Sequence, residues 1–302
     1  MSDPKALIGV IGGSGLYHMP DLTDVEEIRV ETPFGSPSDV VSVGTLSGQR
    51  VAFLPRHGRG HRLTPTELPV RANIWALKSL GVRHLIAVSA VGSLRRKIKP
   101  LDIVIPDQIF DRTKGRPGSF FENGIVAHVG IADPFCPAMR RALYVASKEA
   151  AETKVHDGGT MVVIEGPQFS TKAESRFYRT MGFDIIGMTA IPEAKLAREA
   201  EMDYAVLAMV TDYDVWHESE EPVTAEIVIR NLNQNVATAQ RVLKSVIPRV
   251  VELKCDAGCR DALGSAIATA PDAITPEVRQ RLSLFLDKYY PETGKVTASS
   301  EG

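Results

Sequence analysis

The chain has 302 residues, of which 44% are hydrophobic and 24% are charged. These proportions are those of a globular protein, and they exclude a chain that is disordered as a whole. The formal net charge of −2 argues against a protein that works mainly by binding nucleic acid, and three cysteines are too few for a disulfide scaffold.

Neither a targeting segment nor a membrane span is expected. The N-terminal residues contain a short apolar run, but they lack the basic leader and the small-residue cleavage site of a signal peptide. No stretch approaches the roughly 18 uninterrupted apolar residues that a transmembrane helix needs. We therefore expect a cytoplasmic protein without a membrane partner.

Apolar runs alternate with helical patterns along the chain, which is typical of an α/β protein. The apolar runs predict strands over residues 7–11, 50–54, 84–91, 160–164, 184–188 and 204–210. Helical spacing predicts helices over residues 70–80, 137–154, 172–180, 192–200 and 276–289. The long pattern over 224–253 predicts either two helices or one helix bent at Pro248. Ligand sites in such proteins lie beyond the strand ends, so the loops there are the candidates for function.

Residues 254–302 differ in character from the rest of the chain. Residues 254–273 are rich in small side chains, and residues 291–302 are polar and expected to be disordered. Cys255 and Cys259 form a C-x-x-x-C pair with no histidine nearby and no second pair. Such a pair supports metal binding only weakly, so we expect reduced thiols here. Cys136 has no obvious base beside it in the sequence.

A glycine-rich loop, GGSG at 12–15, follows the first predicted strand. Its spacing does not fit a dinucleotide fingerprint, because the third glycine of G-x-G-x-x-G would fall at His18. It is not a P-loop either, since no G-K-S/T follows. Several bare N–H groups and one hydroxyl suit a small anion, and a tight turn is the alternative.

A basic loop, PRHGRGH at 55–61, follows the second predicted strand. The planar fork of arginine suits phosphate. His57 and His61 are four residues apart, but the glycines between and beside them argue against a helix and so against a zinc-binding face. We predict phosphate binding here, with a solvated basic loop as the alternative.

Two further loops carry candidate groups. Phe169 lies beyond a strand end, where it could stack on a flat base, and Glu165 could either hold sugar hydroxyls or cap the following helix.

Asp212 and Asp214 directly follow a fully apolar strand. Close, partly buried carboxylates raise each other's pKa, so one of them can hold a proton near neutral pH, as a general acid requires. An ordinary turn with an Asx cap is the alternative.

Eight segments occur together in a characteristic order: GGSGL at 12–16, PRHGRGH at 55–61, RAN at 71–73, SAVGSL at 89–94, PDQIFDRT at 106–113, IEGPQFS at 164–170, GMTAIPEA at 187–194 and TDYDVW at 211–216. By these motifs the chain resembles, over about residues 6–253, the 5′-methylthioadenosine phosphorylases, a branch of the trimeric purine nucleoside phosphorylase family. The resemblance implies one nucleoside phosphorylase domain over 1–253, with a central mixed β-sheet flanked by helices. Residues 254–302 would be a C-terminal helical extension with one helix and a disordered tail.

The resemblance implies phosphorolysis of 5′-methylthioadenosine. Phosphate attacks the anomeric carbon and adenine leaves, which gives 5-methylthioribose 1-phosphate. Positive charge grows on the sugar and negative charge on the purine. Phosphate stabilises the first, and a protonated carboxyl near N7 neutralises the second. No metal or organic cofactor is implied, and inorganic phosphate is a co-substrate.

Site residues follow from the same motifs. The catalytic residues would be Asp212, Asp214 and His57, with Asp212 as the proton donor to N7 and Asp214 as the partner of the exocyclic amine, although these two roles could be exchanged. Met188 would contact the ribose, and Phe169 would form a wall of the base pocket. The phosphate shell would consist of Ser14, Arg56, His57, Ser89, Ala90 and Thr189.

The 5′ pocket and the oligomer also follow from the resemblance. Val228 and Ile229 match the apolar 5′ pocket, and Ala225 is smaller than the valine expected beside them, which leaves the breadth of 5′ specificity open. His128 matches a residue that a neighbouring subunit donates to the site, so the resemblance implies a homotrimer.

The acidic pair bears on which purine is preferred. An ionised aspartate accepts a hydrogen bond from the amine of adenine but cannot donate to a 6-oxo group. In the resembling 6-oxopurine enzymes, an asparagine replaces one of these aspartates, so Asp212→Asn should shift preference toward 6-oxopurines. The alternatives are a phosphorylase for 6-oxopurine nucleosides or 5′-methylthioinosine, and a noncatalytic nucleoside-binding protein of the same fold.

Overall fold

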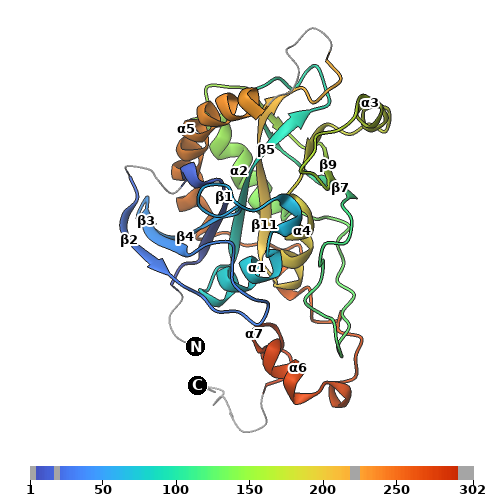
Figure 1. Ribbon diagram of the computed structural model, residues 1–302. Helices are drawn as coiled ribbons and strands as arrows, with labels where there is room; N and C mark the ends of the chain where they lie inside the picture. Colours follow the sequence, from blue (N-terminus) through green and yellow to red (C-terminus); the bar gives the residue numbers. More distant parts are fainter. Residues whose placement is uncertain (1–4, 17–20, 218–224, 292–302) are drawn as a thin grey trace.

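The structure is a computed structural model that describes residues 5–16, 21–217 and 225–291 (Figure 1). Eleven strands among these residues form one mixed sheet with helices on both faces, so the predicted α/β architecture is confirmed. The main path of the sheet runs β2-β3-β4-β1-β5-β10-β9-β7. Strand β11 pairs with β5 and β6, and β6 pairs with β8. The strands are β1 Ile8–Gly12, β2 Thr23–Ile28, β3 Val41–Leu46, β4 Gln49–Pro55, β5 His84–Ser93, β6 Ile103–Ile105, β7 Gln108–Arg112, β8 Val155–Asp157, β9 Thr160–Ile164, β10 Ile185–Gly187 and β11 Asp203–Asp212.

All six predicted strands are present, as β1, β4, β5, β9, β10 and β11. The sequence missed β2, β3, β6, β7 and β8. In β2 five of six residues are exposed, and in β7 four of five, so neither shows an apolar run. Strands β6 and β8 have only three residues each, too few for a pattern to show. Strands that are short or contain few apolar residues show no recognisable pattern in the sequence, because pairing with neighbouring strands determines whether they form.

The central strands divide their side chains between two faces with a period of two. In β11, Tyr204 and Val206 join the core on one face, whereas Ala205 and Leu207 join the core on the other. Helices α1 Val70–Ser79 and α4 Ala190–Glu199 supply Leu77 and Leu196 to the first core. Helices α2 Pro137–Ala150 and α5 Ala225–Val250 pack together over the second core (Figure 1). Burial on both faces explains why the central strands read as continuous apolar runs.

Most predicted helices are confirmed, with two differences near the C-terminus. The pattern over 224–253 forms the single helix α5, with Pro248 in its last turn. Proline has no N–H to donate to the carbonyl oxygen four residues earlier, and at Pro248 that oxygen, of Lys244, accepts the Ser47 hydroxyl at 3.0 Å instead. The helix predicted over 276–289 is instead two short helices, α6 Pro276–Arg281 and α7 Ser283–Leu286. The predicted disordered tail falls on residues 292–302, which lie outside the described residues.

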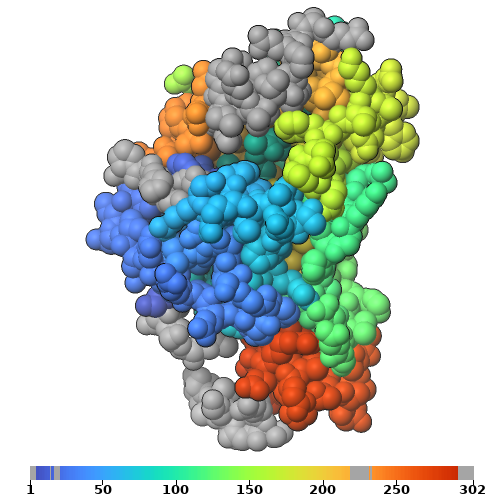
Figure 2. All heavy atoms as spheres, in the orientation of Figure 1, coloured from blue at the N-terminus to red at the C-terminus, as the bar shows by residue number. Residues whose placement is uncertain are grey.

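The described part of the C-terminal segment packs against the rest of the molecule. Leu263, Leu282 and Phe285 are buried in the same core as α1 and α4. Ala127 forms a β-bridge with Ile267, and the segment lies beside the residues near 120 in the space-filling view (Figure 2). This segment therefore completes the apolar core at the end of the sheet shown at the bottom of Figure 1. None of the helices in the described residues is long and apolar enough to span a membrane.

Candidate active site

The predicted functional loops meet because their strands are parallel. Strand β5 runs parallel to β1 and to β11, and β1 runs parallel to β4. The carboxyl ends of these four strands therefore lie at one edge of the sheet, where α/β proteins bind ligands. The Arg56 side chain contacts both β1 and β5, since it donates to the carbonyl oxygens of Ile11 and Val88 at 3.3 and 2.9 Å. These contacts tie the loop after β4 to β1 and β5 at this edge of the sheet.

Arg56 lies in a buried ion pair that the sequence did not predict. It is 3% exposed, and its Nε and Nη2 donate to the two carboxylate oxygens of Glu193 at 2.5 and 3.1 Å. Tyr204 donates its hydroxyl to Glu193 at 3.1 Å. Burial would lower the pKa of Arg56, but the Glu193 carboxylate outweighs it and the net shift is upward. Four of the five N–H groups of Arg56 have partners among the described residues, which leaves one for a bound anion.

His57 is held in a defined tautomer. Its Nδ1 lies 2.8 Å from the carbonyl oxygen of Leu63, and its ring stacks on His61 with centroids 4.2 Å apart. Burial, opposed by the Leu63 carbonyl and reinforced by the charges of Arg56 and His61, lowers the pKa of His57 to about 4. The ring is therefore neutral at pH 7. Because the carbonyl can only accept, Nδ1 carries the proton and Nε2 is an acceptor.

Strand β5 carries two residues of the predicted anion shell, Ser89 and Ala90. Ala90 is exposed although every other residue of this strand is buried. The adjacent Ser89 hydroxyl is buried and has no hydrogen-bond partner among the described residues. Thr189 is buried at the N-terminus of α4, where its side chain makes no capping hydrogen bond. An unpaired buried hydroxyl is costly unless a ligand completes it, so Ser89 fits the predicted anion shell. The side chain of Ser14 lies outside the described residues.

The two carboxyls at the end of β11, Asp212 and Asp214, are both buried, and their hydrogen bonds differ. The register of β11 against β5 shifts between Val210 and Asp212, as at a β-bulge, which re-aims the side chains that follow. Asp212 accepts the Thr211 hydroxyl on Oδ2 and the Asp214 N–H on Oδ1, each at 2.7 Å. This is the Asx turn of the alternative interpretation, and it coexists with the buried pair. Asp214 has φ +53°, and its Oδ2 is buried without a partner among the described residues.

Burial raises the pKa of both carboxyls. For Asp212 burial outweighs the Thr211 and Asp214 hydrogen bonds, which favour its ionised form. Burial also raises the pKa of Asp214, and the charge of Asp212 adds to this effect. The Ser175 hydroxyl and the Val215 N–H oppose it, and the resulting pKa is about 6. The pair can therefore keep one proton near neutral pH, as the spacing predicted.

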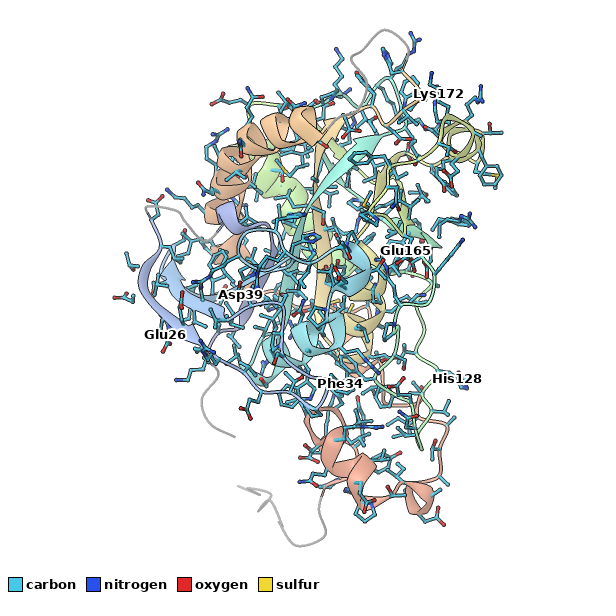
Figure 3. The ribbon with its side chains drawn as sticks, in the orientation of Figure 1. Glu26, Phe34, Asp39, His128, Glu165 and Lys172 are labelled. Atoms are coloured by element: carbon cyan, nitrogen blue, oxygen red, sulfur yellow. The ribbon has the colours of Figure 1, made fainter. Side chains whose placement is uncertain are left out.

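The base and ribose candidates lie on neighbouring loops. Phe169 is 45% exposed, as a residue that stacks on a ligand can be. Met188 is half-buried, and its sulfur packs so closely on Gly166 that an added Cβ would lie 2.5 Å from it. Glu165, labelled in Figure 3, accepts from the Thr66 hydroxyl and the Lys114 N–H. Thr171, not Glu165, caps α3 (Lys172–Thr180), so the capping role considered for Glu165 is wrong.

Arg116 is a second site residue that the sequence did not reveal. Its side chain is 2% exposed and ion-paired with Glu165 at 3.0 Å. Its Nη1 donates to the carbonyl oxygens of Met188 and Ile191 at 2.7 and 2.8 Å. These bonds hold the backbone on both sides of Thr189. Its local sequence, TKGRPGS, resembles a solvated loop, so only the fold shows this positioning role.

His128 lies far from these loops within one chain. It is exposed at the outer edge of the molecule, as Figure 3 shows, and its N–H donates to the Ala266 carbonyl at 2.8 Å. Val228 and Ile229 belong to α5, but their side chains lie outside the described residues. The predicted 5′ pocket therefore stays a prediction.

Comparison with known proteins identifies the family. The phosphorylase superfamily matches the chain over residues 7–248. The chain therefore belongs to the phosphorylase superfamily, and the resemblance to 5′-methylthioadenosine phosphorylases that the motifs indicated is confirmed.

Individual relatives match nearly the whole chain. It is 59% identical to the S-methyl-5'-thioadenosine phosphorylase of Chloroflexus aurantiacus, over 95% of this chain and 99% of that one. A crystal structure of a methylthioadenosine phosphorylase from an antarctic soil metagenomic library matches with a TM-score of 0.89 and 51% identity, over 94% of this chain and 99% of that one. The Schistosoma mansoni methylthioadenosine phosphorylase in complex with adenine matches with a TM-score of 0.81 and 34% identity, over 86% and 98%. The Chloroflexus match covers 287 residues, so it includes part of the segment after residue 253.

Proposed function

We propose that this protein catalyses the phosphorolysis of 5′-methylthioadenosine to adenine and 5-methylthioribose 1-phosphate. The names of its relatives support this substrate. Within the structure, the observation that carries the proposal is the buried pair Asp212 and Asp214, whose pKa values are both raised. A purine leaves an anomeric carbon readily only when it is protonated at N7, and such a pair can supply that proton.

The hydrogen bonds favour an exchange of the two carboxyl roles. Asp212 already accepts two hydrogen bonds that favour its ionised form, so it suits the acceptor for the exocyclic amine of adenine. Asp214 has a pKa of about 6 and a buried oxygen without a partner among the described residues, so it suits the proton donor to N7. We therefore assign N7 to Asp214 and the amine to Asp212.

The anion shell would bind and orient phosphate below the sugar. The Ser89 hydroxyl, the Ala90 N–H and the Thr189 hydroxyl would donate to its oxygens, and Arg56 would supply positive charge and one N–H. Because Nε2 of His57 is an acceptor, we propose that it accepts a hydrogen bond from the P–O–H group of monohydrogen phosphate. This orients an unprotonated oxygen toward the anomeric carbon. The reaction at this site uses no metal or organic cofactor, and phosphate is its co-substrate.

The proposal includes a cytoplasmic homotrimer with shared sites. His128 is exposed at the outer edge of the molecule, as expected for a residue that serves a neighbouring subunit. Val228 and Ile229 would line the apolar 5′ pocket. Gel filtration tests the assembly: a mass near that of one chain, with full activity, contradicts it.

One assay tests the reaction, the co-substrate and the base together. The protein is incubated with 5′-methylthioadenosine, adenosine or 5′-methylthioinosine, with and without phosphate, and free base is quantified. We expect phosphate-dependent release of adenine, fastest from 5′-methylthioadenosine. Faster release of hypoxanthine would identify a 6-oxopurine enzyme instead. Release without phosphate would identify a hydrolase, and no release from any substrate would favour a noncatalytic nucleoside-binding protein.

A further inference from the structure

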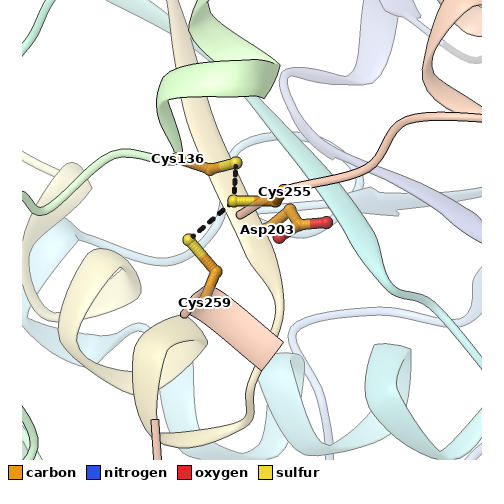
Figure 4. A group of neighbouring side chains, drawn as sticks. All are labelled: Cys136, Asp203, Cys255 and Cys259. Atoms are coloured by element: carbon orange, nitrogen blue, oxygen red, sulfur yellow. Dashed lines mark hydrogen bonds between the residues drawn. The ribbon is translucent and has the colours of Figure 1, made fainter. Parts of the chain in front are cut away.

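All three cysteines of the chain converge on one place with a buried carboxylate (Figure 4). Cys136 is the residue before α2, Cys255 follows α5, and Cys259 begins the 3₁₀ turn Cys259–Asp261. Asp203 is the first residue of β11. One donor atom from each of the four residues lies within 4.8 Å of all the others. Segments that are remote in the sequence thus present four potential metal ligands to one point.

The carboxylate has an unused oxygen in this cluster. Asp203 is completely buried, and its Oδ2 accepts from Nε and Nη2 of Arg260 at 3.0 and 2.8 Å. Its Oδ1 is buried without any hydrogen-bond partner among the described residues. A buried carboxylate oxygen that is left unpaired is costly, so something is expected to complete it. Arg260 meanwhile holds the carboxylate in a fixed orientation, as outer-shell partners of metal ligands do.

The arrangement of sulfur atoms fits a metal better than a disulfide. Cys255 Sγ lies 3.2 Å from Cys136 Sγ and 3.4 Å from Cys259 Sγ, so neither pair is singled out. A disulfide would use two sulfurs and leave both a buried thiol and the unpaired carboxylate oxygen. A tetrahedral zinc ion with Zn–S bonds of about 2.3 Å separates its sulfurs by roughly 3.7 Å, so small shifts suffice. Three thiolates select zinc over magnesium or calcium, which prefer oxygen ligands.

We propose that Cys136, Cys255, Cys259 and Asp203 bind one zinc ion in a closed structural site. The ion joins the start of β11 and of α2 to the segment that follows α5. It lies at the opposite end of β11 from Asp212, so it takes no part in the proposed phosphorolysis. Its role is to anchor residues 254–291 to the sheet. The proposal does not depend on the proposed function.

Metal content tests the site directly. The protein is produced with zinc in the medium, purified under reducing conditions, and analysed for metal by mass spectrometry. We expect one zinc ion per chain. Cys255→Ser and Cys259→Ser should reduce the zinc content to background, whereas the matched control Asp256→Asn, an exposed carboxylate between the two cysteines, should retain it. Arg260→Gln should weaken zinc binding by about 10- to 100-fold, since it removes an outer-shell partner of Asp203.

The wild-type protein decides the question even if the cysteine variants do not fold. Titration with a mercurial should release zinc in step with the modification of three thiols, and a cobalt-substituted protein should show the visible bands of a tetrahedral thiolate site. Absence of zinc from the wild type after reconstitution with zinc overturns the proposal. So does a denatured, unreduced chain with one free thiol and a mass two hydrogens lower, which would show a disulfide.

Discussion

Substitution of Asp212 by asparagine should change which purine the site prefers while leaving the fold intact. The local hydrogen bonds can adapt to asparagine. The amide oxygen can still accept the Asp214 N–H, and the amide nitrogen can donate to the Thr211 hydroxyl. That hydroxyl can turn to the Val91 carbonyl oxygen, which lies 3.3 Å away. No buried group is then left unpaired, so the stability of the variant should stay within about 1 kcal/mol of the wild type.

The expected change in preference follows from the groups that face the purine. Asparagine loses the acceptor for the amine of adenine, and its amide can donate to a 6-oxo group. The substitution creates a mismatch with the amine of adenine and removes a mismatch with the 6-oxo group. Each mismatch leaves one buried polar group unpaired, at a cost of about 1–3 kcal/mol. Together they should move the ratio of kcat/KM for 5′-methylthioinosine over 5′-methylthioadenosine by roughly 30- to 10⁴-fold.

The measurement is kcat/KM for both nucleosides at saturating phosphate, with thermal unfolding of each variant as the check on the fold. Asp214→Asn is the matched control, because it removes the proposed proton donor and should slow both reactions alike. A ratio that Asp212→Asn leaves unchanged would refute the reasoning. A ratio that changes only in Asp214→Asn would return the two carboxyls to the roles first predicted.

Three further predictions concern pH, the buried ion pair and the Met188 contact. Burial raises the pKa of Asp214 to about 6. Because ionisation removes the proposed proton donor, kcat/KM should fall as pH rises through about 6, and Asp214→Asn should not show this fall. Glu193→Gln leaves the charge of Arg56 buried without its partner, so the free energy of unfolding should fall by about 3–5 kcal/mol in urea titrations. Gly166→Ala adds a Cβ 2.5 Å from the Met188 sulfur at a residue with φ +65°, so it should cost about 1–3 kcal/mol of stability and raise the KM for the nucleoside.

Each of these predictions has its own control. If kcat/KM of Asp214→Asn still falls as pH rises through about 6, this carboxyl is excluded as the titrating group. For the ion pair the control is Glu26→Gln, since Glu26 pairs with Arg50 at the surface and should contribute only about 0–1 kcal/mol. Equal losses in Glu193→Gln and Glu26→Gln, measured at one protein concentration, would contradict the importance of the buried pair. Gly48→Ala is the control for Gly166→Ala, because Gly48 also has a positive φ, of +78°, but nothing lies within 4 Å of an added Cβ there; equal effects would contradict the steric argument.

Much of this protein could be predicted from its sequence. The strands buried on both faces, such as β5 and β11, appear as continuous apolar runs, because both of their faces pack against helices. The sequence also placed Arg56 and Asp212 in segments that follow predicted strands, where α/β proteins bind ligands. The parallel pairing that brings these strand ends to one edge of the sheet is seen only in the structure. The spacing of Asp212 and Asp214 likewise indicated a shared proton.

Only the tertiary structure revealed which groups pair over long distances in the chain. Glu193 lies 137 residues from Arg56, and Cys136 lies 119 residues from Cys255, so no local pattern marks either contact. The tautomer of His57 depends on the Leu63 carbonyl, and the pKa of Asp214 depends on its burial. Local sequence sets periodicity and turn chemistry, whereas burial and long-range pairing exist only once the chain has folded, and they decide the charge and the hydrogen-bonding capacity of each site residue.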